Sequence, residues 1–230
     1  MSNESTKRNR VADACQILAG AELVELFTGH VSERDDERIL LPVHLHHSGR
    51  GLESITPQQV ISVDLAGRPL DGREPPSEVP IHTEIFDRRD DVVSVAHAHP
   101  TYATGLSIAQ QPLIAAGLDA SLFGDEVSVY DPGPKLLHGR AGAAELAKAL
   151  DDRPALLLRG HGVVTVGESV AEATARMYLL ERAAKLQTIA ASVGDVVPFE
   201  DLEVDGGFMS ESNAGFFDEV FAFLRREYVD

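Results

Sequence analysis

The pattern of apolar and polar positions predicts strands and helices in alternation along the whole chain. Val92 to Ala98 is rich in β-branched residues and is followed by Pro100, which is typical of a strand that ends there. Further strands are predicted over residues 29–32, 38–43, 60–65, 112–117 and 126–130, and a pair of strands broken at His161 is predicted over residues 155–167. Helices are predicted over residues 11–20, 77–88, 101–107, 139–150, 169–194 and 214–228. Strands mixed with helices and joined by short turns indicate a layered α/β domain.

Local signals place several helix ends. Ser77 is predicted to cap the helix that contains Glu78 in its first turn, and Glu84 and Arg88 are predicted to pair on its outer face. Ser169 opens a predicted capping box before the longest helix. Residues 1–8 are polar, and we expect them to be frayed.

Composition narrows the class of protein. The chain has 230 residues, enough for one domain with a substantial core, spanning residues 1–230. Its net charge of −17 argues against nucleic acid or an anionic membrane surface as the main partner. A small anionic substrate stays possible, because a local site can be basic. Cys15 is the only cysteine, so no internal disulfide can form, and we expect a cytoplasmic protein without a signal peptide or membrane span.

The candidate chemistry centres on histidines. His97 and His99 are two residues apart on a predicted strand, so both imidazoles leave the same face and could share one metal ion. The alternative is a pair of polar residues at a strand end. His161 lies between two glycines that allow a sharp turn and close approach of the backbone. A third imidazole there would give a metal with three protein ligands and an open position, as in catalytic sites.

Four motifs in order resemble the class II aldolase/adducin family, over about residues 11–190. They are Gly29-His30-Val31-Ser32, Ser77-Glu78, His97-Ala98-His99 and His161-Gly162. The resemblance implies a three-layer fold with a mixed, largely antiparallel sheet between helical layers. It also implies that His97, His99 and His161 hold a divalent metal, that Glu78 is the acid/base carboxylate, and that four subunits form active sites at their interfaces. Zinc is the commonest family metal, and three imidazoles also accept manganese, iron or cobalt.

A divalent ion held by neutral imidazoles keeps its full charge and can stabilise an enediolate or phenolate. Glu78 can then move the proton that the new carbanion or enol requires. Retro-aldol cleavage and decarboxylation share this intermediate, so the metal site predicts a carbon–carbon lyase and does not choose between them. A third possibility is a non-catalytic scaffold like adducin, against which the retained histidines and Glu78 count.

The pocket motifs favour decarboxylation. His30 replaces the usual asparagine, Pro76 precedes Ser77 where sugar-phosphate aldolases have two serines, and the loop over residues 44–51 is long and rich in histidine. These departures resemble the branch that decarboxylates hydroxylated aromatic or pyridine dicarboxylates. Arg50 is predicted to hold a carboxylate through two parallel hydrogen bonds, unless this loop is merely solvated. The predicted substrate-binding residues are His30, Ser32, His44, His46, Arg50 and Ser77. His82, Tyr130 and Tyr228 are left between roles in the cleft and ordinary structural ones, with Tyr228 a possible proton donor to a neighbouring subunit.

Overall fold

The structure is a computed structural model that describes residues 3–45, 49–131, 133, 139–200 and 215–230. The helices are α1 (Asn3–Gly20), α2 (Val79–Arg88), α3 (Thr101–Ile108), α4 (Leu118–Ser121), α5 (Arg140–Leu150), α6 (Val170–Val193) and α7 (Phe216–Tyr228). The strands are β1 (His30–Asp35), β2 (Arg38–Pro42), β3 (Val60–Asp64), β4 (Ser94–Ala98), β5 (Leu113–Ile114), β6 (Glu126–Val127), β7 (Val129–Tyr130), β8 (Ala155–Leu158) and β9 (Gly162–Gly167). Short 3₁₀ turns cover Leu52–Ser54 and Pro57–Gln59.

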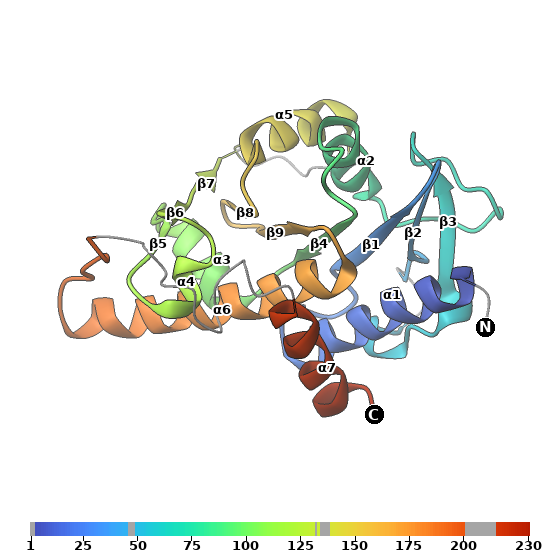
Figure 1. Cartoon of the computed structure of the whole chain (residues 1–230). Coiled ribbons are helices and arrows are strands. Elements are labelled where there is room, and N and C mark those ends of the chain that lie inside the picture. Colours follow the sequence, from blue (N-terminus) through green and yellow to red (C-terminus); the bar gives the residue numbers. More distant parts are fainter. Residues whose placement is uncertain (1–2, 46–48, 132, 134–138, 201–214) are drawn as a thin grey trace.

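A mixed sheet forms the middle layer of the molecule (Figure 1). Its strand order is β3-β2-β1-β4-β9-β8-β7, and among the described strands only the pair β7–β8 is parallel. β5 and β6 pair separately. Helices α2 and α5 cover one face, and α1, α3, α6 and α7 lie on the other (Figure 1). The predicted α/β fold, with a largely antiparallel sheet between helical layers, is confirmed.

The two faces of the sheet each have a hydrophobic core. Ile81 and Ile85 of α2 pack on Ile39, Val95 and their neighbours, whereas the other face packs against α1 and α6. β4 pairs with β1 along one edge and with β9 along the other, helices pack on both faces of the sheet, and all residues of β4 are buried. The histidine pattern at the end of β4 is therefore held by a fully buried strand in the interior of the sheet.

Three local predictions were wrong. The chain is helical from Asn3, because Lys7 pairs with Asp35 at 2.7 Å and Arg8 donates to the backbone of β3 and to Ser62. These long-range contacts anchor a segment whose polar sequence predicted fraying.

At α2, the residue at the N-cap is Glu78, not Ser77, and no side chain caps the helix end. Glu84 does not pair with Arg88: its side chain is buried beneath α5 and accepts from Arg140 at 2.7 Å. The packing of α2 on α5 thus replaces the predicted surface pair. At α6 the predicted cap is confirmed, because Ser169 accepts from the backbone N–H of Glu172 at 3.1 Å.

Within the described parts of the chain, every helix is too short or too polar to cross a bilayer.

Candidate metal centre and active site

His97 and His99 stand at the end of β4, as predicted. His97 is fully buried, and its backbone lies opposite His30 on β1 and Val164 on β9. His99 follows the strand, where its backbone N–H donates to the carbonyl of Leu23 at 3.0 Å. Pairing on both sides of β4 fixes the direction in which these imidazoles point.

His161 joins them from the turn between β8 and β9. Gly160 has a φ of +63°, which a residue with a side chain rarely adopts, and Gly162 lies directly against the end of β4. A Cβ on Gly162 would lie 2.3 Å from the carbonyl oxygen of Ala98 and 2.6 Å from the ring of His99. The predicted sharp turn and close approach are both present, and they bring the His161 ring within 5.1 Å of the His99 ring, centroid to centroid.

Glu78 completes the cluster from the start of α2. Its Oε1 lies 3.2 Å from Nε2 of His161, and its Oε2 lies 3.5 Å from Nε2 of His97. The candidate ligand atoms of Glu78, His97, His99 and His161 all lie within 4.8 Å of one another. Burial would raise the pKa of Glu78, but contacts with His161, His30 and His97 outweigh it and hold that pKa well below its usual range.

The protonation of the imidazoles suits a cation. Nδ1 of His97 lies 2.9 Å from the carbonyl oxygen of Val163, which can only accept, so the proton is on Nδ1 and Nε2 carries a lone pair. That lone pair faces Nε2 of His99 at 3.1 Å and the carboxylate of Glu78. Burial lowers the pKa of His97, and it lowers the pKa of His99 to about 3.

Acceptor atoms therefore converge on one point, which a cation would occupy favourably. Two nitrogens bound to one tetrahedral ion at about 2.0–2.1 Å would be about 3.3 Å apart, close to the 3.1 Å between His97 and His99. The residues present thus fit a divalent metal.

The cluster opens into a cavity of about 310 Å³. His99, His161 and Glu78 form its metal-facing end. The remaining lining is apolar or polar, and consists of Phe27, Thr28, Gly29, His30, Pro42, Val43, His44, Leu45, Leu52, Pro76 and Ser77. Among the described residues, no lysine or arginine lines it.

The structure places the six predicted substrate-binding residues differently from one another. His30, His44 and Ser77 line the cavity. Ser32 does not, because it is fully buried beneath α2, where its Oγ lies 2.6 Å from His82. Arg50 is exposed and is not among the lining residues. His46 lies outside the described residues.

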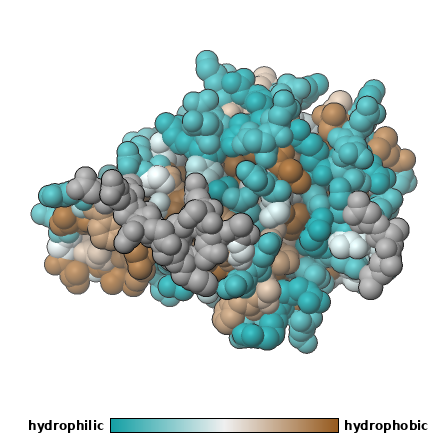
Figure 2. All heavy atoms as spheres, in the orientation of Figure 1, coloured by the Kyte–Doolittle hydropathy of each residue, from teal (hydrophilic) through white to brown (hydrophobic). Residues whose placement is uncertain are grey.

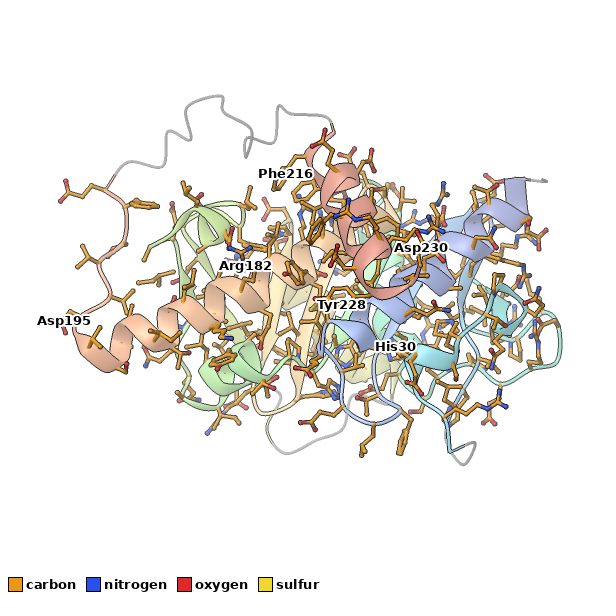
Figure 3. The ribbon with its side chains drawn as sticks, turned by 90° about the horizontal axis from the view of Figure 1, so that it is seen from below. His30, Arg182, Asp195, Phe216, Tyr228 and Asp230 are labelled. Atoms are coloured by element: carbon orange, nitrogen blue, oxygen red, sulfur yellow. The ribbon has the colours of Figure 1, made fainter. Side chains whose placement is uncertain are left out.

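The structure also locates His82, Tyr130 and Tyr228, whose roles the sequence left open. His82 is fully buried and its Nε2 lies 2.6 Å from Nδ1 of His30, so it touches the cavity wall from behind. Tyr130 lies on β7, with its hydroxyl 3.4 Å from Glu145, outside the cavity lining. Tyr228 packs on Gly20 at the end of α1 and lies on α7 (Figure 3), and it is not among the residues that line the cavity.

Comparison with known proteins agrees with this geometry. The family model described as Class II Aldolase and Adducin N-terminal domain matches residues 9–188. The chain belongs to this family.

Several family members with named activities are similar to the chain. A 3,4-dihydroxyphthalate decarboxylase of Terrabacter sp. (strain DBF63) is 37% identical, over 86% of this chain and 88% of that protein. An L-fuculose phosphate aldolase of Methanococcus vannielii is 29% identical, over 77% of this chain and 93% of that protein. The solved structure of an L-fuculose 1-phosphate aldolase superposes with a TM-score of 0.79 at 25% identity, over 92% of this chain and 97% of that one. The predicted class, a metal-dependent carbon–carbon lyase of the family's decarboxylase and aldolase branches, is confirmed.

The sequence did not predict one part of the site in this chain, which is the hydrogen-bonded set of Ser32, His82 and His30. A signal was present, since His82 lies one helical turn after Glu78 and Ser32 lies two residues after His30 on a strand. The pairing of β1 with β4 and the packing of α2 across them bring the three together.

Proposed function

We propose that this protein is a divalent-metal-dependent decarboxylase of a dihydroxylated aromatic dicarboxylate, with 3,4-dihydroxyphthalate as the first candidate. The observation that carries the proposal is a cluster of three histidines and Glu78 that opens into a cavity lined by imidazoles and apolar side chains. A flat ring with neighbouring hydroxyls suits that lining. The 37% identity to a 3,4-dihydroxyphthalate decarboxylase supports this substrate.

In the proposed site, His97, His99 and His161 hold the ion. When bound, the ion supplies a Lewis acid for two adjacent oxygens of the substrate. Zinc is the expected ion, and manganese, iron and cobalt are alternatives with the same donor set. The backbone contact of His97 with Val163 fixes the tautomer that this role requires.

Glu78 moves the proton. Its low pKa makes it a carboxylate at neutral pH, so it can accept the proton of the substrate hydroxyl next to the leaving carboxylate. It can then deliver that proton to the ring carbon that carries the carboxylate. The carbon–carbon bond breaks, CO₂ departs, and the electron pair of that bond restores the aromatic ring with its oxygen anionic. One proton and one CO₂ are exchanged at the same carbon.

The remaining lining residues position the ring. Phe27 and Leu52 offer apolar surface, and His30, His44 and Ser77 offer hydrogen bonds to polar substituents. Arg50 keeps its predicted role of holding the carboxylate that stays in the product. Its exposed position on the loop after His44 means that its side chain would have to reach over the cavity mouth.

Two assays on one sample test the proposal. Metal-loaded protein is incubated with 3,4-dihydroxyphthalate and, separately, with L-fuculose 1-phosphate, and the release of CO₂ and of aldehyde is measured. CO₂ from the aromatic acid with little aldehyde is expected. Efficient aldehyde release with no CO₂ from any hydroxy acid would establish the aldolase alternative instead.

Metal content separates the enzyme from a scaffold. Each of His97→Ala, His99→Ala and His161→Ala is expected to lose bound metal and activity, as measured by elemental analysis and CO₂ release. A variant that kept one equivalent of metal with normal turnover would remove that histidine from the ligand set. Wild-type protein without bound metal or turnover would favour a scaffold.

We propose further that the protein is a cytoplasmic homotetramer with its sites at subunit interfaces. Exposed apolar residues support association: Leu186, Ile189 and Val193 are each at least half exposed on the outer part of α6. Figure 2 shows apolar surface at that end of the molecule. Sedimentation velocity would test the subunit number, and a monomer with full activity would refute sites that need a neighbour.

A further inference from the structure

Three polar side chains form a buried hydrogen-bonded set behind the cavity. Ser32 and His30 are two residues apart on β1, so both face α2, and His82 of α2 lies over them. Nδ1 of His82 is 2.6 Å from Oγ of Ser32, and Nε2 of His82 is 2.6 Å from Nδ1 of His30. Ser32 and His82 are fully buried, and His30 is 4% exposed. We refer to these residues as the Ser32–His82–His30 chain.

The hydrogen bonds of the chain can run in two directions. In one, His30 donates from Nδ1 to His82, which donates from Nδ1 to Ser32, and Nε2 of His30 carries a lone pair. In the other, Ser32 donates to His82, His82 donates to His30, and Nε2 of His30 carries a proton. The direction therefore decides whether His30 offers the cavity an acceptor or a donor.

Glu78 decides between them. Its Oε2 lies 3.8 Å from Nε2 of His30, beyond hydrogen-bond distance but close enough for charge to matter. A lone pair facing a carboxylate is repelled, whereas an N–H facing it is attracted. The favoured chain starts at the Ser32 hydroxyl and ends with an N–H at Nε2 of His30.

That N–H has no hydrogen-bond partner within the described structure, although the atom is buried. His30 also lines the cavity, and the favoured direction of the chain makes its buried Nε2 a donor beside the substrate site. A buried donor without a partner is costly, and a ligand that supplies an acceptor removes that cost.

We propose that Ser32 and His82 are positioning residues that hold His30 as an Nε2–H donor, and that this donor binds the substrate carboxylate that remains in the product. A hydrogen bond to the leaving carboxylate would stabilise a charge that disappears in the reaction and would slow it. The retained carboxylate keeps its charge throughout, so the bond contributes equally to substrate and transition state. The identity of the acid rests on the proposed function.

The test is a comparison of two unreactive ligands. Zinc-loaded protein is titrated by calorimetry with 3,4-dihydroxybenzoate, which has the retained carboxylate, and with catechol, which lacks it. His82→Phe is expected to weaken the binding of 3,4-dihydroxybenzoate roughly tenfold, which corresponds to the loss of one hydrogen bond to a charged group. The affinity for catechol is expected to stay within about twofold of the wild-type value. His82→Gln, whose amide can still donate to His30, is expected to recover most of the difference.

A matched control and a second measurement keep the test decisive. Thr83→Val changes another buried polar side chain of α2, which bonds only the Pro80 carbonyl, and should not alter the preference between the ligands. Nitrogen NMR of histidine-labelled, zinc-loaded wild type should place the His30 proton on Nε2. Ser32→Ala should weaken the preference in the same direction as His82→Phe, and it serves as the test if His82→Phe does not fold.

Three outcomes would overturn the proposal. The first is a His30 proton on Nδ1 in the wild type. The second is a folded His82→Phe variant whose affinity falls equally for both ligands. The third is a wild type that binds 3,4-dihydroxybenzoate no more tightly than catechol. Failure of the proposed function is separate from these. A protein that releases no CO₂ but prefers 3,4-dihydroxybenzoate through the Ser32–His82–His30 chain would refute the decarboxylase and retain the positioning role.

Discussion

Gly162→Ala should damage the metal centre without touching a ligand. Gly162 lies after His161 and against the end of β4, and a Cβ there would be 2.3 Å from the Ala98 carbonyl oxygen. An ordinary contact begins near 3.4 Å, so β9 must move by about 1 Å or the end of β4 must yield. The same Cβ would lie 2.6 Å from the ring of His99, which must turn away.

The expected magnitude follows from these overlaps. Forcing one methyl group into a packed site typically costs about 1–3 kcal/mol of stability. Backbone atoms of β4 cannot rotate away as a flexible side chain can, so the upper part of that range is expected here. A shift of about 1 Å in a ligand or reacting group can cost about 10²-fold in activity, and Gly162→Ala should lose that much in kcat/KM together with much of its metal.

Urea unfolding, elemental analysis and CO₂ release measure the three effects. Gly105→Ala is the matched control: Gly105 is an exposed position inside α3, and a Cβ there meets nothing within 4 Å. That change should stabilise the protein by about 0.5–1 kcal/mol and leave the metal in place. Wild-type stability and metal content in Gly162→Ala would refute the close approach that the structure describes.

Three further predictions concern charge and protons. Glu78→Gln should keep the fold and the metal but lose about 10²–10⁴-fold in kcat, and activity within about threefold of wild type would exclude Glu78 as the acid/base. Arg50→Ala should raise KM for a dicarboxylate more than it lowers kcat at unchanged thermal stability, because Arg50 is exposed; a fall in kcat alone would contradict its binding role. Burial lowers the pKa of His82 well below 6.5. As the pH falls below 6.5, His82 therefore binds a proton in the unfolded chain but stays neutral in the folded chain. Metal-free protein should lose up to about 1.4 kcal/mol per pH unit for this group as pH falls below 6.5, and urea titrations of His82→Phe should show a shallower decline.

The sequence alone predicted which histidines lie together in the candidate metal centre and the order of the helices and strands. A histidine on alternate residues of an apolar strand must place both rings on one face, and glycines around His161 allow a tight turn, because both are short-range properties of the backbone. Helix and strand positions such as Thr101–Ile108 and Arg38–Pro42 followed from equally local patterns.

Only the tertiary structure decided which polar residues are buried and what they contact. Glu84 was expected at the surface and is buried against Arg140, Ser32 was expected in the cavity and lies behind it, and His82 joins Ser32 to His30. Each outcome depends on a partner about 50 residues or more away in the sequence. The spacing of residues along a helix or a strand predicts which face a side chain occupies. Its hydrogen-bond partners, however, belong to the elements that pack against that face.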